Sequence, residues 1–186
     1  METIISFLNY QPFGEYNTTA AVIALIYGIF GYIVYNVYVL WDINDICKDH
    51  RKITILPKSI SDTFYEIEVR WLFQMFMVSS IFSILCMGQN VLYIIVAVFF
   101  SIMTVNPSVR SGDRYLVPHM IGAITATVLA LLGLGISFGT WSVPICVACA
   151  LVPIVITERK NPSIIYIVEQ ICFISLMIGF LLSIIC

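Results

Sequence analysis

The amino-acid sequence predicts an all-α, polytopic membrane protein with six transmembrane helices and one short cytoplasmic interfacial helix. Three observations lead to this fold class. Of the 186 residues, 60% are hydrophobic and only 11% are charged, whereas a soluble domain has about 25% charged residues. The apolar residues gather in six long runs, as they do in segments that cross a bilayer. All nine Lys and Arg residues fall in alternate connections between these runs.

The six apolar runs are expected to be membrane-spanning helices. At about 1.5 Å of rise per residue, the first, fourth and sixth can cross a hydrocarbon core of about 30 Å, and the other three are marginal in length. The expected spans are Thr18–Leu40, Trp71–Met87, Val91–Val105, Tyr115–Phe138, Trp141–Thr157 and Ser163–Cys186. We therefore expect an external N-terminal segment at residues 1–17 and a single six-helix domain at residues 18–186.

The basic residues predict the orientation, because Lys and Arg in short loops stay on the cytoplasmic side of a membrane. None of them occurs in residues 1–17, 88–90 or 139–140. The nine basic residues are Lys48, Arg51, Lys52, Lys58, Arg70, Arg110, Arg114, Arg159 and Lys160. This segregation predicts a multi-pass protein of the plasma or inner membrane with both termini on the non-cytoplasmic side.

The connection at residues 41–70 is the longest cytoplasmic loop that the spans predict. After Pro57, apolar residues recur at offsets of 4, 7 and 11, which places them on one helical face. These residues are Ile60, Phe64, Ile67 and Trp71. The spacing favours a short helix on the membrane surface, and a docking site for a partner is the alternative.

Ionisable residues inside membrane spans are candidates for a functional site, because they are costly in lipid unless they are paired or hydrated. His119 and Glu169 are two such residues, and both helices begin at the cytoplasmic side. Gln74, Asn106 and Gln170 are expected at a similar depth. Together the five residues predict a polar cavity open to the cytoplasm that binds a substrate or a proton. The alternative is that these groups only hold helices together by hydrogen bonds.

Two stripes of small residues suggest how His119 and Glu169 would meet. Small residues at helical spacing let two helices approach closely. One stripe follows His119 and comprises Gly122, Ala126, Ala130 and Gly133. The other follows Glu169 and comprises Cys172, Ser175, Gly179 and Ser183. If the two stripes pack together, His119 and Glu169 form a pair.

A second hypothesis concerns three aspartates near the predicted cytoplasmic ends of helices. Asp42 and Asp45 follow the first span, and Asp113 lies in the sequence Arg-Ser-Gly-Asp at residues 110–113. These positions resemble those of the two catalytic aspartates in prepilin peptidases, a family of intramembrane aspartyl proteases. Arg110 stands where that family has a glycine, and Tyr115 stands where it has a lysine. The resemblance implies an acid–base pair of carboxyl groups that share a proton.

Several other functions have no support in the sequence. The net charge of −2 provides no basic surface for nucleic acid. No phosphate-binding glycine loop or hydrolase motif occurs, so neither a cofactor nor a metal site is expected.

The expected partners are membrane lipids and further copies of the same chain, because the marginal spans leave short apolar bands that neighbours could cover. Three functional classes stay open. A small transporter or pore subunit for a proton, ion or small solute ranks first. An intramembrane enzyme acting on lipid or peptide ranks second, and a membrane scaffold ranks third.

Overall fold

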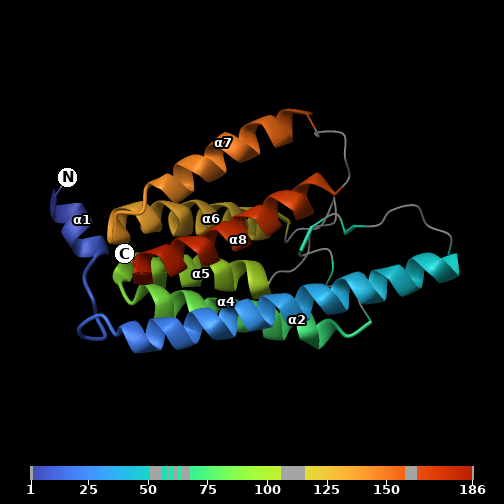
Figure 1. The fold of residues 1–186 in the computed structure, drawn as a ribbon, viewed down its shortest axis with the longest axis horizontal. Helices are drawn as coiled ribbons and strands as arrows, with labels where there is room; N and C mark the ends of the chain where they lie inside the picture. The colour runs from blue at the N-terminus through green and yellow to red at the C-terminus, as the bar shows by residue number, and fades with distance from the viewer. Residues whose placement is uncertain are drawn as a thin grey trace.

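The computed structural model describes residues 2–50, 56–57, 59–60, 63, 68–105, 116–157 and 163–185, with backbone only for 43–50 and 116. Within these ranges the regular elements are all helices, and no strand occurs (Figure 1). The seven helices are α1 (Glu2–Leu8), α2 (Thr18–His50), α4 (Arg70–Gly88), α5 (Val91–Val105), α6 (Leu116–Phe138), α7 (Ser142–Thr157) and α8 (Ile164–Ile185).

The helices from α2 onward form one bundle in which successive helices run in opposite directions (Figure 1). Neighbours in sequence pack on each other from α4 to α8, and α2 packs mainly on α4. Helix α8 also contacts α2 and α6, which brings the last helix of the chain against the first long one. Both chain termini lie at the same end of the bundle (Figure 1).

Four helices are long and apolar enough to cross a membrane. They comprise 19 to 25 residues each and lie at Thr18–Asp42, Arg70–Gly88, Val117–Phe138 and Ile164–Ile185. Helices α5 and α7 are also apolar but contain only 15 and 16 residues. The prediction of an all-α protein is thus confirmed for the described residues, and four of the six expected spans have the length and composition of membrane-spanning helices.

The predicted helix boundaries agree with the observed ones to within one residue, except at the end of the first long helix. Helix α2 continues ten residues beyond Leu40, as far as His50, and projects past the other helices (Figure 1). No Gly or Pro interrupts residues 41–50, so nothing local stops the helix where its apolar run ends. The expected loop therefore begins later than Trp41. Most residues of the expected interfacial helix lie outside the described ranges.

The N-terminal segment packs on the end of the bundle. The backbone N–H of Val91 donates to the carbonyl oxygen of Tyr10 (3.0 Å), and the hydroxyl of Tyr16 donates to the carbonyl oxygen of Met87 (3.1 Å). The hydroxyl of Ser137 donates to Asn9 Oδ1 (2.8 Å). These hydrogen bonds anchor residues 9–16 to the turns at this end.

Aromatic side chains form the centre of the core. The rings of Tyr35 and Phe76 stack with centroids 4.2 Å apart. Phe173 lies 5.6 Å from Phe76 and 5.7 Å from Phe100. These rings join α2, α4, α8 and α5, because large aromatic side chains bury much area and lose little conformational freedom. Phe76 and Phe173 also lie against the ring of Tyr32, whose hydroxyl forms a hydrogen bond with Gln170 of α8.

Candidate functional site

Four polar side chains form a network between α2 and α8. They come from Tyr32 and Asn36 on α2 and from Tyr166 and Gln170 on α8, each pair separated by four residues and so on one helical face. Asn36 Oδ1 accepts hydrogen bonds from the Tyr166 hydroxyl (3.0 Å) and from Gln170 Nε2 (2.7 Å). The Tyr32 hydroxyl donates to Gln170 Oε1. Asn36 Nδ2 donates to the carbonyl oxygen of Tyr32 (2.9 Å). Both amide side chains thus use their donor and acceptor groups.

Residues of the connection between α2 and α4 form hydrogen bonds with residues adjacent in sequence to this network or near the start of α8. Ser163 Oγ donates to the carbonyl oxygen of Leu56 (3.0 Å), and the backbone N–H of Ile60 donates to Glu169 Oε2 (2.5 Å). The hydroxyls of Tyr35 and Thr63 form a third hydrogen bond. The side chains of Ile60 and Thr63 are almost completely buried. The connection therefore folds into the bundle and contacts α2 and α8 through defined polar groups.

Glu169 has a second environment, because it also lines a cavity of about 310 Å³ between α5, α6 and α8. Among the described residues that line this cavity, Glu169 is the only acidic or basic one, and most of the others are aliphatic or aromatic. A charged carboxylate in apolar surroundings is costly unless a counter-charge or hydrogen bonds compensate it. The carboxyl group can therefore hold a proton or a cation at the cavity wall.

His119 is almost completely buried on α6, with 1% of its surface exposed. Gly122, on the same helical face, packs on the backbone of α5: a Cβ atom there would lie 2.8 Å from the carbonyl oxygen of Phe99 and 3.1 Å from the nitrogen of Met103. Gly133 likewise faces Tyr93 of α5.

The hypothesis that the two small-residue stripes pack on each other is contradicted at both ends of the α6 stripe, where Gly122 and Gly133 face α5. Between them, Ala126 and Ala130 line the same cavity as Cys172 of the α8 stripe. On α8, Gly179 makes room for the side chain of Leu134, so α6 and α8 meet through one large and one small residue. A pairing of His119 with Glu169 stays a prediction.

The other predicted site residues are dispersed. Gln170 is part of the network between α2 and α8. Gln74 is exposed on α4, away from the network. Asn106 lies outside the described residues.

The three aspartates of the protease hypothesis are only partly described. The carboxyl group of Asp42 is buried and accepts a hydrogen bond of 3.0 Å from the backbone N–H of Glu68. This bond fixes the start of α4 to α2. The side chain of Asp45 and the whole of Asp113 lie outside the described residues. Within the described part of the chain, no group of three or more His, Cys, Asp or Glu residues could hold a metal ion.

The sequence-based search did not identify Tyr32, Asn36 or Tyr35 as part of the site. A signal for Asn36 was present, since it is the one amide side chain within the apolar run of the first span. Amides in membrane helices usually form hydrogen bonds to other helices. Asn36 is not ionisable, so the criterion of an ionisable group within a span does not select it.

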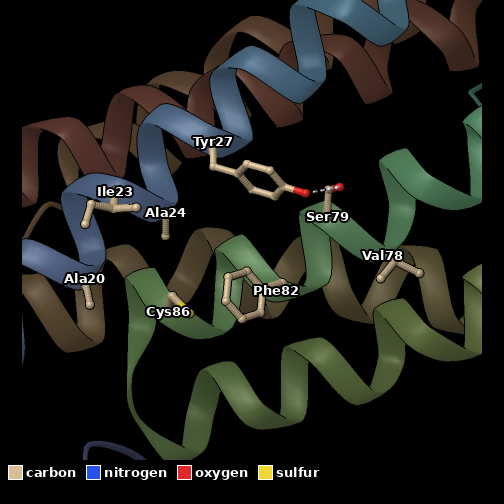
Figure 2. A pocket seen from close by; sticks show the side chains of 8 residues that line it. All are labelled: Ala20, Ile23, Ala24, Tyr27, Val78, Ser79, Phe82 and Cys86. Atoms are coloured by element: carbon tan, nitrogen blue, oxygen red, sulfur yellow. Dashed lines mark hydrogen bonds between the residues drawn. The ribbon is translucent and has the colours of Figure 1, made fainter.

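A second hollow lies on the outside of the bundle. Figure 2 shows it as a groove between α2 and α4, in which the hydroxyls of Tyr27 and Ser79 lie 3.2 Å apart. Its lining comprises Ala20, Ile23, Ala24, Tyr27, Val78, Ser79, Phe82 and Cys86. Ile23, Val78 and Phe82 are exposed. Its described lining contains no Asp, Glu, Lys, Arg or His.

No protein-family model, curated protein or solved structure matches this chain. Within the described part of the chain, the candidate site is the carboxyl group of Glu169, which lines an apolar cavity and accepts a hydrogen bond from the connection between α2 and α4. At the cavity wall, this carboxyl group can release a proton and bind a cation in its place.

Proposed function

We propose that this chain is a small membrane transporter, or a transporter subunit, that crosses the bilayer six times and binds a proton or a small cation at Glu169. The six crossings are supported by the alternating directions of α2 and α4–α8 and by the position of both termini at one end (Figure 1). Helices α5 and α7 extend about 22 and 24 Å at the usual helical rise. Contacts with neighbouring helices, or with a second copy of the chain, would cover these short spans.

The proposed orientation places both termini outside the cytoplasm. The turns at the terminal end of the bundle contain no Lys or Arg, whereas the connections at the other end contain all the basic residues apart from Lys48 and Arg70 at adjoining helix ends. Basic residues stay on the cytoplasmic side during insertion. Glu169 lies in the second turn of α8 and so near the cytoplasmic end of that helix.

The observation that carries the proposal is that Glu169 lines an apolar cavity inside the bundle. A transporter needs a group that binds its ion inside the membrane and releases it when its surroundings change. Glu169 fits this role because a carboxyl group can hold either a proton or a cation. The hydrogen bond from the backbone N–H of Ile60 links the charge state of Glu169 to the position of the connection between α2 and α4.

We also assign His119, Gln170, Gln74 and Asn106 to the transport path as proposals of lower rank. Gln170 is next to Glu169 in sequence and belongs to the network that joins α8 to α2. His119 is buried on α6, a helix that lines the same cavity.

The experiment is a flux measurement in liposomes that contain the purified protein and a trapped pH indicator. The external pH is changed abruptly, and the rate of pH equilibration is followed in media that contain Na⁺, K⁺ or organic ammonium ions. The wild-type chain should accelerate equilibration over empty liposomes in at least one medium. Glu169→Gln should abolish the acceleration, and the control Glu68→Gln, at an exposed acidic residue, should leave it unchanged. Full flux in Glu169→Gln would contradict the proposal.

A scaffold function is the second candidate, and the network between α2 and α8 favours it. In that network each amide group both donates and accepts a hydrogen bond, as expected of side chains that only join helices. The flux experiment separates the two candidates, because a scaffold accelerates equilibration in none of the media. Proteolysis would depend on Asp42, Asp45 and Asp113, so cleavage that is lost in Asp113→Asn would favour the enzyme instead.

A further inference from the structure

The cavity beside Glu169 has a shape and lining that define a class of ligand. Its volume of about 310 Å³ lies at the lower end of the range of small-molecule pockets. It has room for about ten non-hydrogen atoms if each takes up as much space as a water molecule in the liquid. The ligand is therefore small and largely apolar.

Two aromatic rings lie in the wall of this cavity. Phe100 of α5 and Phe173 of α8 both line it, and their ring centroids are 5.7 Å apart at an angle of 75° between the planes. In such a pair the edge of one ring lies against the face of the other. Aromatic side chains are the groups that bind quaternary ammonium ions in proteins, and both rings contribute to this wall. Glu169 on the same wall supplies the opposite charge.

The charges around Glu169 favour a cation over an anion. Among the described residues, Tyr35 of α2 and both Tyr166 and Cys172 of α8 are titratable groups near its carboxyl group, and Tyr and Cys side chains are ordinarily neutral at pH 7. On α6 the titratable residue is the buried His119. No Lys or Arg lines the cavity among its described residues. A ligand with one positive charge can therefore serve as a counter-charge to Glu169 inside the cavity.

The rim of the cavity indicates how such a ligand enters. Ile124 and Val128 of α6 and Ile165 of α8 line the cavity and are about half exposed. Helix α7 contributes Leu151 to the lining, while its fully buried residues, Val143 and Val147, are in its first half, and the helix diverges from α8 beyond them (Figure 1). The opening faces the side of the bundle, where lipid surrounds a membrane protein. A hydrophobic ligand can reach the site through the bilayer.

We propose that the cavity binds a small hydrophobic organic monocation, with Glu169 as the counter-charge and Phe100 and Phe173 as the aromatic wall. This inference rests on the proposed function, since it names the substrate class of the same site. When the cation binds, the proton held by the carboxyl group of Glu169 passes to the solvent, so one positive charge replaces another. Transport is then an exchange of a proton for the organic cation.

The test measures binding of phenyltrimethylammonium to the purified protein in detergent by isothermal titration calorimetry. The uncharged control ligand is tert-butylbenzene, which has the same shape. The wild-type chain should bind the cation at least about tenfold more tightly than the neutral ligand. Titrations in buffers with different heats of ionisation should show release of a proton. Equal affinities for the two ligands would overturn the proposal and indicate a cavity for lipid chains.

Two variants and a control complete the test. Glu169→Gln should weaken cation binding about tenfold or more, while it leaves the binding of tert-butylbenzene nearly unchanged. Ala123→Phe fills the cavity without altering the carboxyl group, and it should weaken the binding of both ligands. Glu68→Gln should change neither. Cation binding that survives in both Glu169→Gln and Ala123→Phe would place the ligand elsewhere and overturn the inference.

The binding and flux experiments together distinguish a failure of this inference from a failure of the proposed function. Proton flux that needs Glu169 but occurs only with Na⁺ or K⁺, with no binding of phenyltrimethylammonium, would retain the transporter and overturn the organic cation as its substrate. Cation binding that needs Glu169 without flux in any medium would retain the binding site and remove the transport function.

Discussion

The backbone N–H of Ile60 donates a hydrogen bond of 2.5 Å to Glu169 Oε2, although the two residues are 109 positions apart in the chain. The bond joins the connection between α2 and α4 to the last helix of the bundle. It also gives the carboxyl group of Glu169 two neighbours, a peptide group and an apolar cavity. Any change in the charge of Glu169 therefore affects both the ligand site and the position of this connection.

Removal of the acceptor at Glu169 should destabilise the protein more than removal of the charge. Glu169→Met has no oxygen to accept the Ile60 N–H, whereas Glu169→Gln retains one. We expect Glu169→Met to be less stable than Glu169→Gln by about 1–3 kcal/mol, since a buried donor is left unpaired. Reversible unfolding in mixed micelles measures the difference. Glu68→Met is the matched control and should lie within about 0.5 kcal/mol of wild type.

Asn36 should contribute to stability through two donors on α8. Asn36→Leu leaves the hydroxyl of Tyr166 and the amide of Gln170 without their shared acceptor, so we expect a loss of about 1–3 kcal/mol. Gln170→Leu should cause a similar loss, and the double variant should lose less than the sum because the residues contact each other. Gln74→Leu, at an exposed amide, is the control. Additive losses would show that the two amides act independently.

The contact between α5 and α6 should not tolerate a methyl group at Gly122. A Cβ atom there would lie 2.8 Å from a backbone oxygen, which cannot move aside as a flexible side chain does. We expect Gly122→Ala to cost about 1–3 kcal/mol. Gly31→Ala is the matched control, because nothing lies within 4 Å of its Cβ position. It should stabilise α2 by about 0.5–1 kcal/mol. Equal effects at the two glycines would contradict the close approach of α5 and α6.

The pairing of His119 with Glu169 can be measured by a double-mutant cycle. If the two side chains share one polar site, His119→Gln and Glu169→Gln should each abolish flux, and their stability losses should be coupled by at least about 0.5 kcal/mol. The double variant should then recover stability without activity. Strictly additive losses would show that His119, on the face of α6 that carries Gly122, does not contact Glu169.

The orientation can be measured by cysteine labelling in a cysteine-free background with a reagent that does not cross membranes. Phe13→Cys, at an exposed position near the termini, should react in intact cells. Ile55→Cys should react only after permeabilisation, because the basic residues predict a cytoplasmic connection there. Labelling of Ile55→Cys in intact cells would reverse the orientation and place Glu169 near the opposite surface.

The sequence by itself determined the helices and most of their boundaries. Apolar runs end where polar or turn-forming residues begin, as at Gly88 and Gly139, and these local signals do not depend on distant parts of the chain. The apolar run did not predict the end of α2, because residues 41–50 include six polar residues and are still compatible with a helix. Glu169 and Gln170 could be identified because a polar group within an apolar run is visible in the sequence alone.

Only the tertiary structure decided which polar groups meet. Helical spacing shows which residues share a face, but several neighbours can occupy the space opposite that face. Gly122 faces α5, where the carbonyl oxygen of Phe99 and the backbone nitrogen of Met103 lie close to it. No residue of α6 indicates this contact. Glu169 receives its hydrogen bond from Ile60 for a similar reason. The two residues are 109 positions apart in the sequence, so the bond forms only when the connection between α2 and α4 packs against α8. The packing of the whole bundle decides contacts between such distant residues.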